Sequence, residues 1–240
     1  MSFNIFKSNQ RGYFKNEWLE TFYSFSFADW FDRTRMNFGT LRVLNDDTIQ
    51  PNAGFGMHPH NDMEIITIIL EGKLKHIDSM NNEGLISEGE IQVMSAGSGI
   101  YHSEFNPSSD KETKLFQIWI YPFKKGLTPE YKQFKYDSNA ISNKISTLVG
   151  PKNKDFPLTI NQNAYLSLAQ IDEGKSLSYI SKAIDSGVFI MNIDGILLIN
   201  NNILDKKDSI EILDENEIKI SAIKQAKLLI IEVPMERKYE

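Results

Sequence analysis

Short runs of β-branched and other apolar residues recur along the whole chain, and each has the length of a strand. Residues 65–70 read IITIIL and are followed by Glu71 and Gly72, and residues 228–231 read LLII. Val and Ile favour strands, and no long stretch shows the i, i+3, i+4 apolar spacing of an amphipathic helix. Short strands separated by turns about every eight to twelve residues are typical of antiparallel sandwiches and barrels. The sequence therefore predicts a mostly-β fold.

Clusters of turn-forming residues give the expected ends of these strands. Asn45, Asp46 and Asp47 are expected to form a turn after a strand over residues 39–44, and Asp194-Gly195 is expected to form a hairpin turn between strands over 188–193 and 196–199. The remaining segments are predicted from the same signals. Strands are expected over residues 22–27, 65–70, 74–78, 91–94, 115–120, 165–169, 218–220 and 228–231, with turns over 80–84 and 88–90.

The composition of the chain changes near its middle. Residues 122–140 are polar, residues 150–155 are loop-like, and strand-like runs resume at Tyr165. A chain of 240 residues can hold two domains of ordinary size. We therefore predict two β-barrels of similar plan. All four histidines lie in the first half and the chain has no cysteine, so the second half cannot build an imidazole or thiolate site and is expected to support the first half or to contact a partner.

Composition excludes several classes of function. The formal net charge of −6 and the pI of about 5.4 disfavour a general electrostatic role on nucleic acid or on an anionic membrane. The absence of cysteine excludes disulfides. Residues 1–11 lack the apolar run of a signal peptide, and no apolar stretch is long enough to span a membrane. We expect a soluble, cytoplasmic protein without direct nucleic-acid or membrane binding.

Three of the histidines belong to two pairs in which one residue separates two potential metal ligands. His58 and His60 form one pair, and His102 and Glu104 form the other. Side chains at i and i+2 of a strand point to the same side, so two such strands paired in one sheet would bring four ligands together. Imidazoles and a carboxylate suit divalent Fe, Mn, Co, Ni, Cu or Zn. Four protein ligands on an octahedral ion leave two positions open, which indicates catalysis rather than a closed structural site.

Alternatives remain open for the other polar residues near this pattern. Glu64 lies four residues after His60 and could replace Glu104 as the carboxylate ligand, because the spacing does not decide between them. Gln117 could orient a water or a substrate, or be an ordinary polar residue of a strand. His76 stands alone, and a lone histidine is more often a packed or surface residue, so we leave it out of the predicted site.

The spacing of these residues resembles the two-part motif of the cupin superfamily. Seven residues separate Glu64 from Gly72, four separate Gly97 from His102, and Ser95 stands where proline is usual, which are departures from the general pattern. These departures are similar to the pirin family of bicupins. The motif residues are His58, His60, Glu64, Gly72, Gly89, His102 and Asn106, and the segments similar to pirins are 25–28, 41–47, 54–60, 70–72, 76–79, 96–104 and 117–119.

The resemblance implies two tandem cupin barrels of the jelly-roll type, over residues 1–135 and 136–240, with one metal in the first barrel only. It places the ligands on His58, His60, His102 and Glu104, and it makes Glu104 the candidate catalytic base. Bacterial members are associated with quercetin 2,3-dioxygenase activity, in which dioxygen opens a flavonol and carbon monoxide is released. Fe(II) is the metal most expected, with Zn, Mn, Ni, Co and Cu as alternatives.

Two other functions compete with this one. The resemblance to pirins of higher organisms implies a non-enzymatic metal- or redox-sensing protein that acts through a protein partner. A cupin isomerase, or a dioxygenase on another substrate, is a further alternative. The presence or absence of turnover with quercetin separates the first two.

Overall fold

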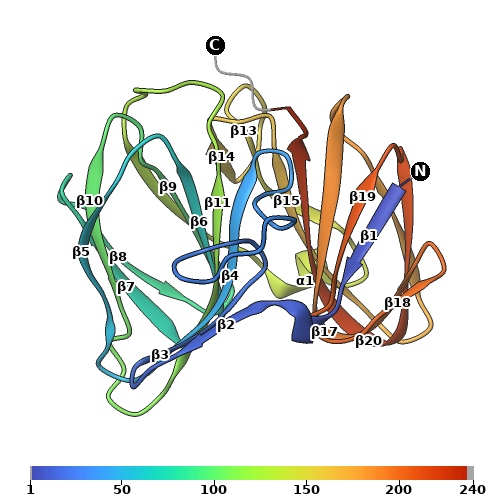
Figure 1. The fold of residues 1–240 in the computed structure, drawn as a ribbon, viewed down its shortest axis with the longest axis horizontal. Helices are drawn as coiled ribbons and strands as arrows, with labels where there is room; N and C mark the ends of the chain where they lie inside the picture. The colour runs from blue at the N-terminus through green and yellow to red at the C-terminus, as the bar shows by residue number, and fades with distance from the viewer. Residues whose placement is uncertain (1, 237–240) are drawn as a thin grey trace.

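Three sheets carry most of the secondary structure in residues 2–236, which the computed structural model describes. Seven strands in the order β12-β9-β6-β11-β4-β3-β2 and four in the order β5-β10-β7-β8 form one lobe, and a nine-stranded sheet forms the other (Figure 1). Strand pairs are antiparallel except β13 with β14. The mostly-β prediction and the prediction of two barrels are confirmed.

The first lobe contains strands β2 (Gly12–Lys15), β3 (Leu19–Tyr23), β4 (Leu41–Ile49), β5 (Gly54–His60), β6 (Glu64–Glu71), β7 (Lys73–Asp78), β8 (Glu83–Ser87), β9 (Glu90–Ser95), β10 (Ile100–Phe105), β11 (Thr113–Ile120) and β12 (Glu130–Lys135). The second lobe contains β1 (Ser2–Phe6), β13 (Ser146–Pro151), β14 (Leu158–Ile160), β15 (Tyr165–Ile171), β16 (Ser176–Ile180), β17 (Ser186–Ile199), β18 (Asn202–Leu204), β19 (Ser209–Leu213) and β20 (Glu217–Pro234). The helices are η1 (Ser8–Gln10) and α1 (Ser138–Ile141), so none in the described residues has the length or the apolar surface to cross a membrane.

The first strand of the chain lies in the second lobe. β1 pairs with β19, with Ser2 opposite Leu213, and Figure 1 shows this N-terminal strand beside the C-terminal sheet. A division of the chain at residue 135 stays a proposal, and it has to allow for the N-terminal strand β1 lying in the C-terminal lobe. Residues 1 and 237–240 of the two proposed domains lie outside the described residues.

Continuous apolar strands arise because the two lobes pack against each other. In β6, Ile66 and Ile68 belong to a core cluster that also contains Leu229 and Ile231 of β20, whereas Ile69 belongs to another cluster on the opposite face of the strand. Both faces of β6 are therefore buried, and side chains that alternate between the faces must all be apolar. This explains the run that the sequence shows at residues 65–70.

Two of the predicted turns are wrong, because long strands continue through them. β4 runs to Ile49, so Asp46 and Asp47 are strand residues paired with both β3 and β11. β17 is one strand through Asp194-Gly195, where the register with β20 shifts. Gly195 has a φ of +84°, and a Cβ there would overlap the Gln225 carbonyl oxygen, so this glycine allows a bulge rather than a hairpin.

Two further strand predictions are corrected. The segments 218–220 and 228–231, expected as separate strands, belong to the single strand β20. The strand expected over 22–27 ends at Tyr23, although Phe25 beyond it is buried. β17 and β20 are paired, bulged strands that bend around the lobe without a turn. The polar residues that interrupt their apolar runs therefore look like strand ends in the sequence.

The interior of the second lobe is filled with apolar side chains from β15, β17, β19 and β20, including Ile190, Ile210 and Ile230. Glu232 is an exception that is fully buried. Its carboxylate accepts hydrogen bonds from the Tyr179 hydroxyl at 2.7 Å, the Ser186 hydroxyl at 2.7 Å and the backbone N–H groups of Lys182 and Ala183. It therefore fixes the segment between β16 and β17.

Replacing Glu232 with Leu is expected to lower the free energy of unfolding by about 3 kcal/mol, because the buried Tyr179 hydroxyl and three part-buried donors lose their acceptor. Urea denaturation measures this change. The exposed Glu217→Leu change on the same strand is the control and is expected to stay within about 0.5 kcal/mol of the wild type. Equal effects of the two changes would contradict the role given to Glu232.

Candidate metal centre

Neighbouring strands β5 and β10 of the four-stranded sheet position three histidines. His58 lies directly opposite His102 in the register of this antiparallel pair, and His60 lies two residues further along the same face of β5. The ring centroids are 4.5 Å apart for His58 and His102, 4.8 Å for His58 and His60, and 4.9 Å for His60 and His102. Potential ligand nitrogens of the three rings all lie within 4.8 Å of one another.

The electrostatics of these rings favour metal binding. Burial, together with repulsion from His58, lowers the pKa of His60 to about 4. Burial, together with repulsion from His58, His60 and His76, lowers the pKa of His102 to about 2. Both imidazoles are therefore neutral near pH 7 and offer lone pairs. His102 is buried, and neither of its ring nitrogens has a hydrogen-bond partner among residues 2–236. A buried nitrogen without a partner fits a metal ligand, so this donor set could hold a divalent transition metal.

Glu104 lies beside this group rather than within it. The register between β5 and β10 shifts after His102, which places Glu104 opposite Phe55. One carboxylate oxygen of Glu104 and one ring nitrogen each of His76 and His102 all lie within 4.8 Å of one another. The structure therefore contains two groups of three potential ligands that share His102.

Three neutral donors hold the Glu104 carboxylate. Gln92 donates to Oε1 at 3.0 Å, Thr67 donates to the same oxygen at 3.2 Å, and Gln117 donates to Oε2 at 2.7 Å. All these side chains come from the seven-stranded sheet, on the inner face of β6, β9 and β11. Gln117, which the sequence left undecided, thus contacts the candidate base.

Glu64 points away from the histidines, into the contact between the lobes. Its carboxylate accepts hydrogen bonds from the Ser95 hydroxyl at 2.6 Å and from Asn161 of the second lobe at 2.9 Å. Burial raises the pKa of this carboxyl, although the two hydrogen bonds act against the rise. The geometry thus gives no support to Glu64 as a ligand.

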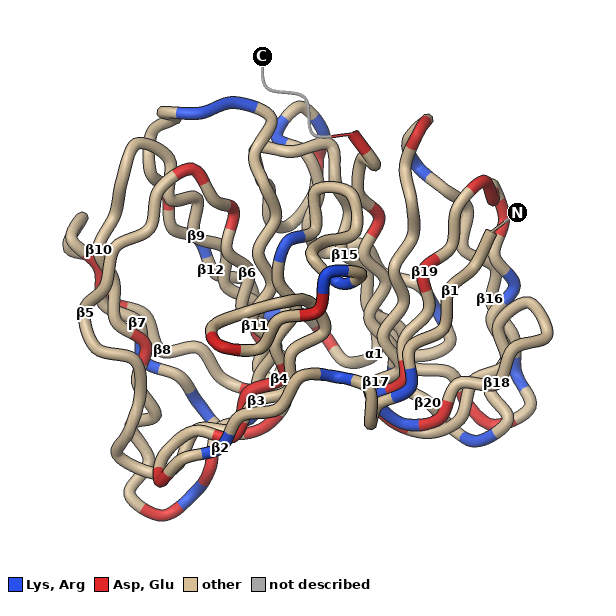
Figure 2. The backbone as a smooth tube through the Cα atoms, in the orientation of Figure 1, with Lys and Arg blue, Asp and Glu red and all other residues tan. Residues whose placement is uncertain are grey.

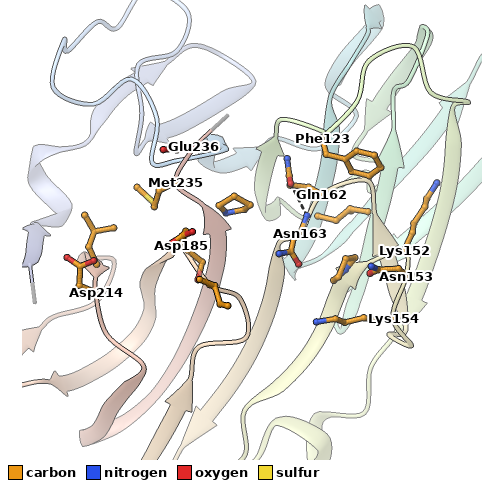
Figure 3. Close-up of a pocket in the computed structure, with 16 residues that line it drawn as sticks. Phe123, Lys152, Asn153, Lys154, Gln162, Asn163, Asp185, Asp214, Met235 and Glu236 are labelled. Carbon is orange, nitrogen blue, oxygen red and sulfur yellow. Dashed lines mark hydrogen bonds between the residues drawn. The ribbon is translucent and has the colours of Figure 1, made fainter. Parts of the chain in front are cut away.

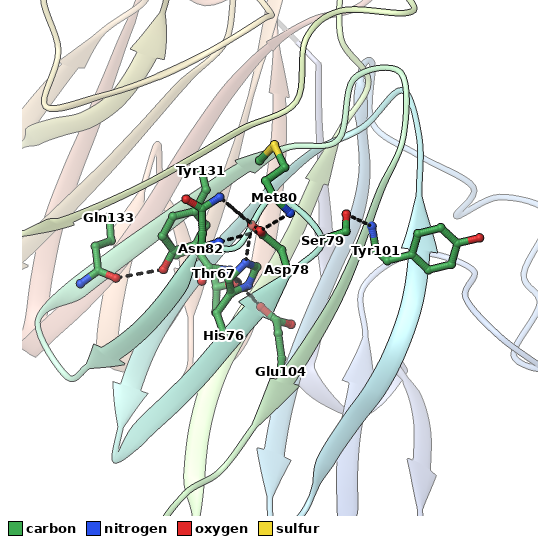
Figure 4. A network of polar contacts seen from close by, with 11 residues as sticks. Thr67, His76, Asp78, Ser79, Met80, Asn82, Tyr101, Glu104, Tyr131 and Gln133 are labelled. Atoms are coloured by element: carbon green, nitrogen blue, oxygen red, sulfur yellow. Dashed lines mark hydrogen bonds and ion pairs between the residues drawn. The ribbon is translucent and has the colours of Figure 1, made fainter.

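His76 is the residue that sequence reasoning missed. It is fully buried, its Nε2 lies 3.1 Å from Asp78 Oδ2, and its ring stacks on Tyr131 with centroids 4.5 Å apart (Figure 4). Asp78 is itself held by the backbone N–H groups of Met80 and Asn82. Burial acts to raise the pKa of Asp78, but hydrogen bonds from Asn82 and His76 outweigh it and lower the pKa. The alternating burial of β7, in which residues 74, 76 and 78 face inward, is the signal that could have found this pair.

The three histidines border a cavity of about 300 Å³ inside the first lobe. Its walls come from β3, β4, β5, β6, β10 and β11 and from Phe27. They are largely apolar, with polar groups from β4 and β11 on the seven-stranded sheet. The lining residues are Leu19, Thr21, Tyr23, Phe27, Asn45, Asp47, Phe55, His58, His60, Ile65, His102, Glu104, Gln117 and Trp119. Asn45 and Asp47 were predicted as turn residues, so no feature of the sequence placed them at this cavity.

A larger cleft of about 1040 Å³ lies elsewhere on the molecule and involves both lobes. Lys152, Asn153 and Lys154 lie on one side of it and Asp185 and Asp214 on the other (Figure 3). None of the described residues that line it is a histidine. Basic and acidic residues are interspersed over both lobes (Figure 2). The smaller cavity is therefore the one that combines a concave apolar surface with potential metal ligands.

Comparisons with known proteins agree with this geometry. A family model described as "Pirin" matches residues 6–120, and one described as "Quercetinase C-terminal cupin domain" matches residues 147–233. The chain is 40% identical over 229 residues to a quercetin 2,3-dioxygenase of Escherichia coli strain K12, covering 95% of this chain and 97% of the relative. It is 38% identical over 216 residues to a pirin-like protein of Caulobacter vibrioides, covering 90% and 92%.

Solved structures show the same fold. The crystal structure of YhhW from Escherichia coli superposes with a TM-score of 0.92 at 37% identity, covering 97% of this chain and 98% of that chain. The structure of bacterial pirin YhhW in complex with nickel(II) gives a TM-score of 0.91 at 36% identity, covering 97% and 99%. The predicted arrangement of two cupin barrels is therefore confirmed.

Proposed function

The chain belongs to the pirin family, and from that premise we propose that it is a metal-dependent dioxygenase that opens flavonols such as quercetin with O2 and releases carbon monoxide. The observation that carries the proposal is the group of three imidazoles at the wall of an apolar cavity of about 300 Å³. The full-length similarity to a protein named quercetin 2,3-dioxygenase supports the choice of substrate and reaction.

The proposed metal ligands are His58, His60 and His102, with Glu104, whose carboxylate lies close to the shared ligand His102, as the fourth. The nickel(II) complex of the Escherichia coli pirin supports a single divalent ion, and Fe(II) is our first choice because the reaction uses dioxygen. When bound, such an ion acts as a Lewis acid that lowers the pKa of a hydroxyl group placed on it.

The chain's own residues bind the substrate and take its proton. The apolar side chains of Leu19, Phe55 and Ile65 pack against the flat rings of a flavonol and exclude water. Glu104, at the cavity wall, accepts the proton of the flavonol 3-hydroxyl group on a carboxylate oxygen. Gln117, whose amide donates to Glu104 Oε2 at 2.7 Å, holds that carboxylate in place.

Anaerobically prepared Fe(II)-loaded protein is expected to consume O2 and release carbon monoxide when quercetin and O2 are added. Oxygen-electrode and gas-chromatographic measurements follow the two gases. Glu104→Gln is expected to lower kcat by on the order of 10²-fold or more, because the amide cannot accept the proton. A wild-type protein that retains metal but shows no turnover with any of the six metals would contradict the proposal and favour the sensing role.

A further inference from the structure

Two adjacent aspartates of β4 have opposite surroundings. Asp46 lies on one face of the strand, where Arg11 and Lys207 each form an ion pair with it at 2.9 Å. Asp47 lies on the other face, lines the cavity and is 3% exposed. In the part of the chain that the structure describes, no Lys, Arg or His forms an ion pair with Asp47. A buried carboxyl without a cation is costly to maintain for stability alone.

A buried polar atom without a partner lies on the same face. Asn45 is two residues before Asp47 in β4, so the two side chains point the same way into the cavity. Asn45 is 4% exposed, and its Oδ1 accepts no hydrogen bond from residues 2–236. Leaving a buried acceptor unsatisfied costs about 1–3 kcal/mol. The Asn45 oxygen therefore lacks a donor that a ligand could supply, and the carboxyl of Asp47 beside it offers a further acceptor.

The surroundings indicate what kind of donor fits. The same cavity is lined by Leu19 and Tyr23 of the neighbouring strand β3 and by Phe27. A charged ligand group would be desolvated among these side chains. Burial raises the pKa of Asp47 to about 7, against the lowering effect of Thr21, and the negative charges of Asp46 and Glu104 contribute to the rise. A carboxyl that is partly protonated near neutral pH suits a neutral hydroxyl group better than an ammonium group.

We propose that Asn45 and Asp47 form a subsite that binds a phenolic hydroxyl group of the ligand, on the sheet that faces the histidines. The subsite selects hydroxylated aromatic ligands over ligands of the same shape without that hydroxyl. The proposal rests on the proposed function for the choice of flavonols as ligands. It goes beyond that function because it assigns recognition of a hydroxyl group to β4, whereas the proposed metal ligands lie on β5 and β10.

Anaerobic titration calorimetry of the metal-loaded protein tests the subsite, because binding is measured without turnover. The probes are quercetin, which has hydroxyl groups on both ring systems, and 3-hydroxyflavone, which has only the 3-hydroxyl group. The wild type is expected to bind quercetin roughly 10- to 100-fold more tightly, the effect of one hydrogen bond to a charged or partly charged group. Asp47→Ala is expected to reduce this ratio to about threefold or less, mainly through weaker binding of quercetin, and the isosteric Asp47→Asn to an intermediate value.

Asp46→Asn is the matched control, because it makes the same chemical change on the other face of β4 and is expected to leave the ratio unchanged. An unchanged ratio in Asp47→Ala, or equal weakening of both ligands, would overturn the subsite. Carbon monoxide release with an unchanged ratio keeps the proposed function and rejects the subsite. If Asp47→Ala reduces the ratio but the wild type releases no carbon monoxide, the subsite is kept and the proposed function is rejected. A wild type that binds neither probe overturns both.

Discussion

The His102→Ala protein is expected to purify with little or no bound metal, because His102 belongs to both groups of potential ligands in the first lobe. Metal sites in small zinc-binding peptides have apparent binding free energies of about 10–16 kcal/mol. If four ligands share such a value equally, one ligand is worth about 2.5–4 kcal/mol, so its removal weakens binding by on the order of 10²- to 10³-fold. Metal analysis of the purified protein and competition with a chelator measure the effect.

Variants that break only one of the two groups distinguish between them. His58→Ala and His60→Ala remove ligands of the first group and are expected to lose metal as His102→Ala does. His76→Phe removes a member of the second group while it keeps a ring against Tyr131, and it is expected to retain metal. Loss of metal from His76→Phe, with metal retained in His58→Ala, would move the proposed centre to the second group.

In the metal-free protein, Asp47→Asn is expected to raise the free energy of unfolding by on the order of 2–4 kcal/mol more at pH 8 than at pH 4. The pKa of Asp47 is raised by burial from its ordinary value of 3.8 to about 7 in the folded protein. Between these two values the folded state binds a proton that the unfolded state has released, so the free energy of unfolding falls as the pH rises. Each pKa unit corresponds to about 1.4 kcal/mol, and asparagine removes this loss.

Urea unfolding of wild type and variant at several pH values between 4 and 8 measures the difference. His60 and His102 are present in both proteins, so their own protonation cancels in the comparison. A difference in stability that does not change with pH would contradict the raised pKa of Asp47. A variant that gains stability and loses part of its discrimination between flavonols would be an example of a binding site maintained at a cost in stability.

Local pattern was sufficient to predict part of the site. Alternation along a strand placed His58 and His60 on one face of β5, and the pairing of β5 with β10 brought His102 to them. The rule holds here because it depends only on the geometry of one extended chain and of its neighbour. The same rule could have found His76, which alternates with Leu74 and Asp78 in β7, but a lone histidine gave no reason to apply it.

The remainder of the site depended on contacts distant in sequence. A register shift moved Glu104 out of line with His58 and His60, and such a shift has no local signature. Asn45 and Asp47 have the composition of a turn, yet β3 and β11 on either side hold them in a nine-residue strand. Glu64 turns away because Asn161, 97 residues later, donates a hydrogen bond to it across the contact between the lobes.

The sequence by itself determined the mostly-β class, the restriction of histidine chemistry to the first half and the convergence of His58, His60 and His102. These follow from composition and from strand periodicity, which are properties of short segments. Only the tertiary structure decided that Glu104 lies in a second group with His76, that Asp47 faces the cavity with no cation among residues 2–236 paired to it, and that β1 joins the sheet of the other lobe. Those outcomes depend on which strands pair, in which register, and on which side chains neutralise each charge, and these are set by packing between segments far apart in the chain.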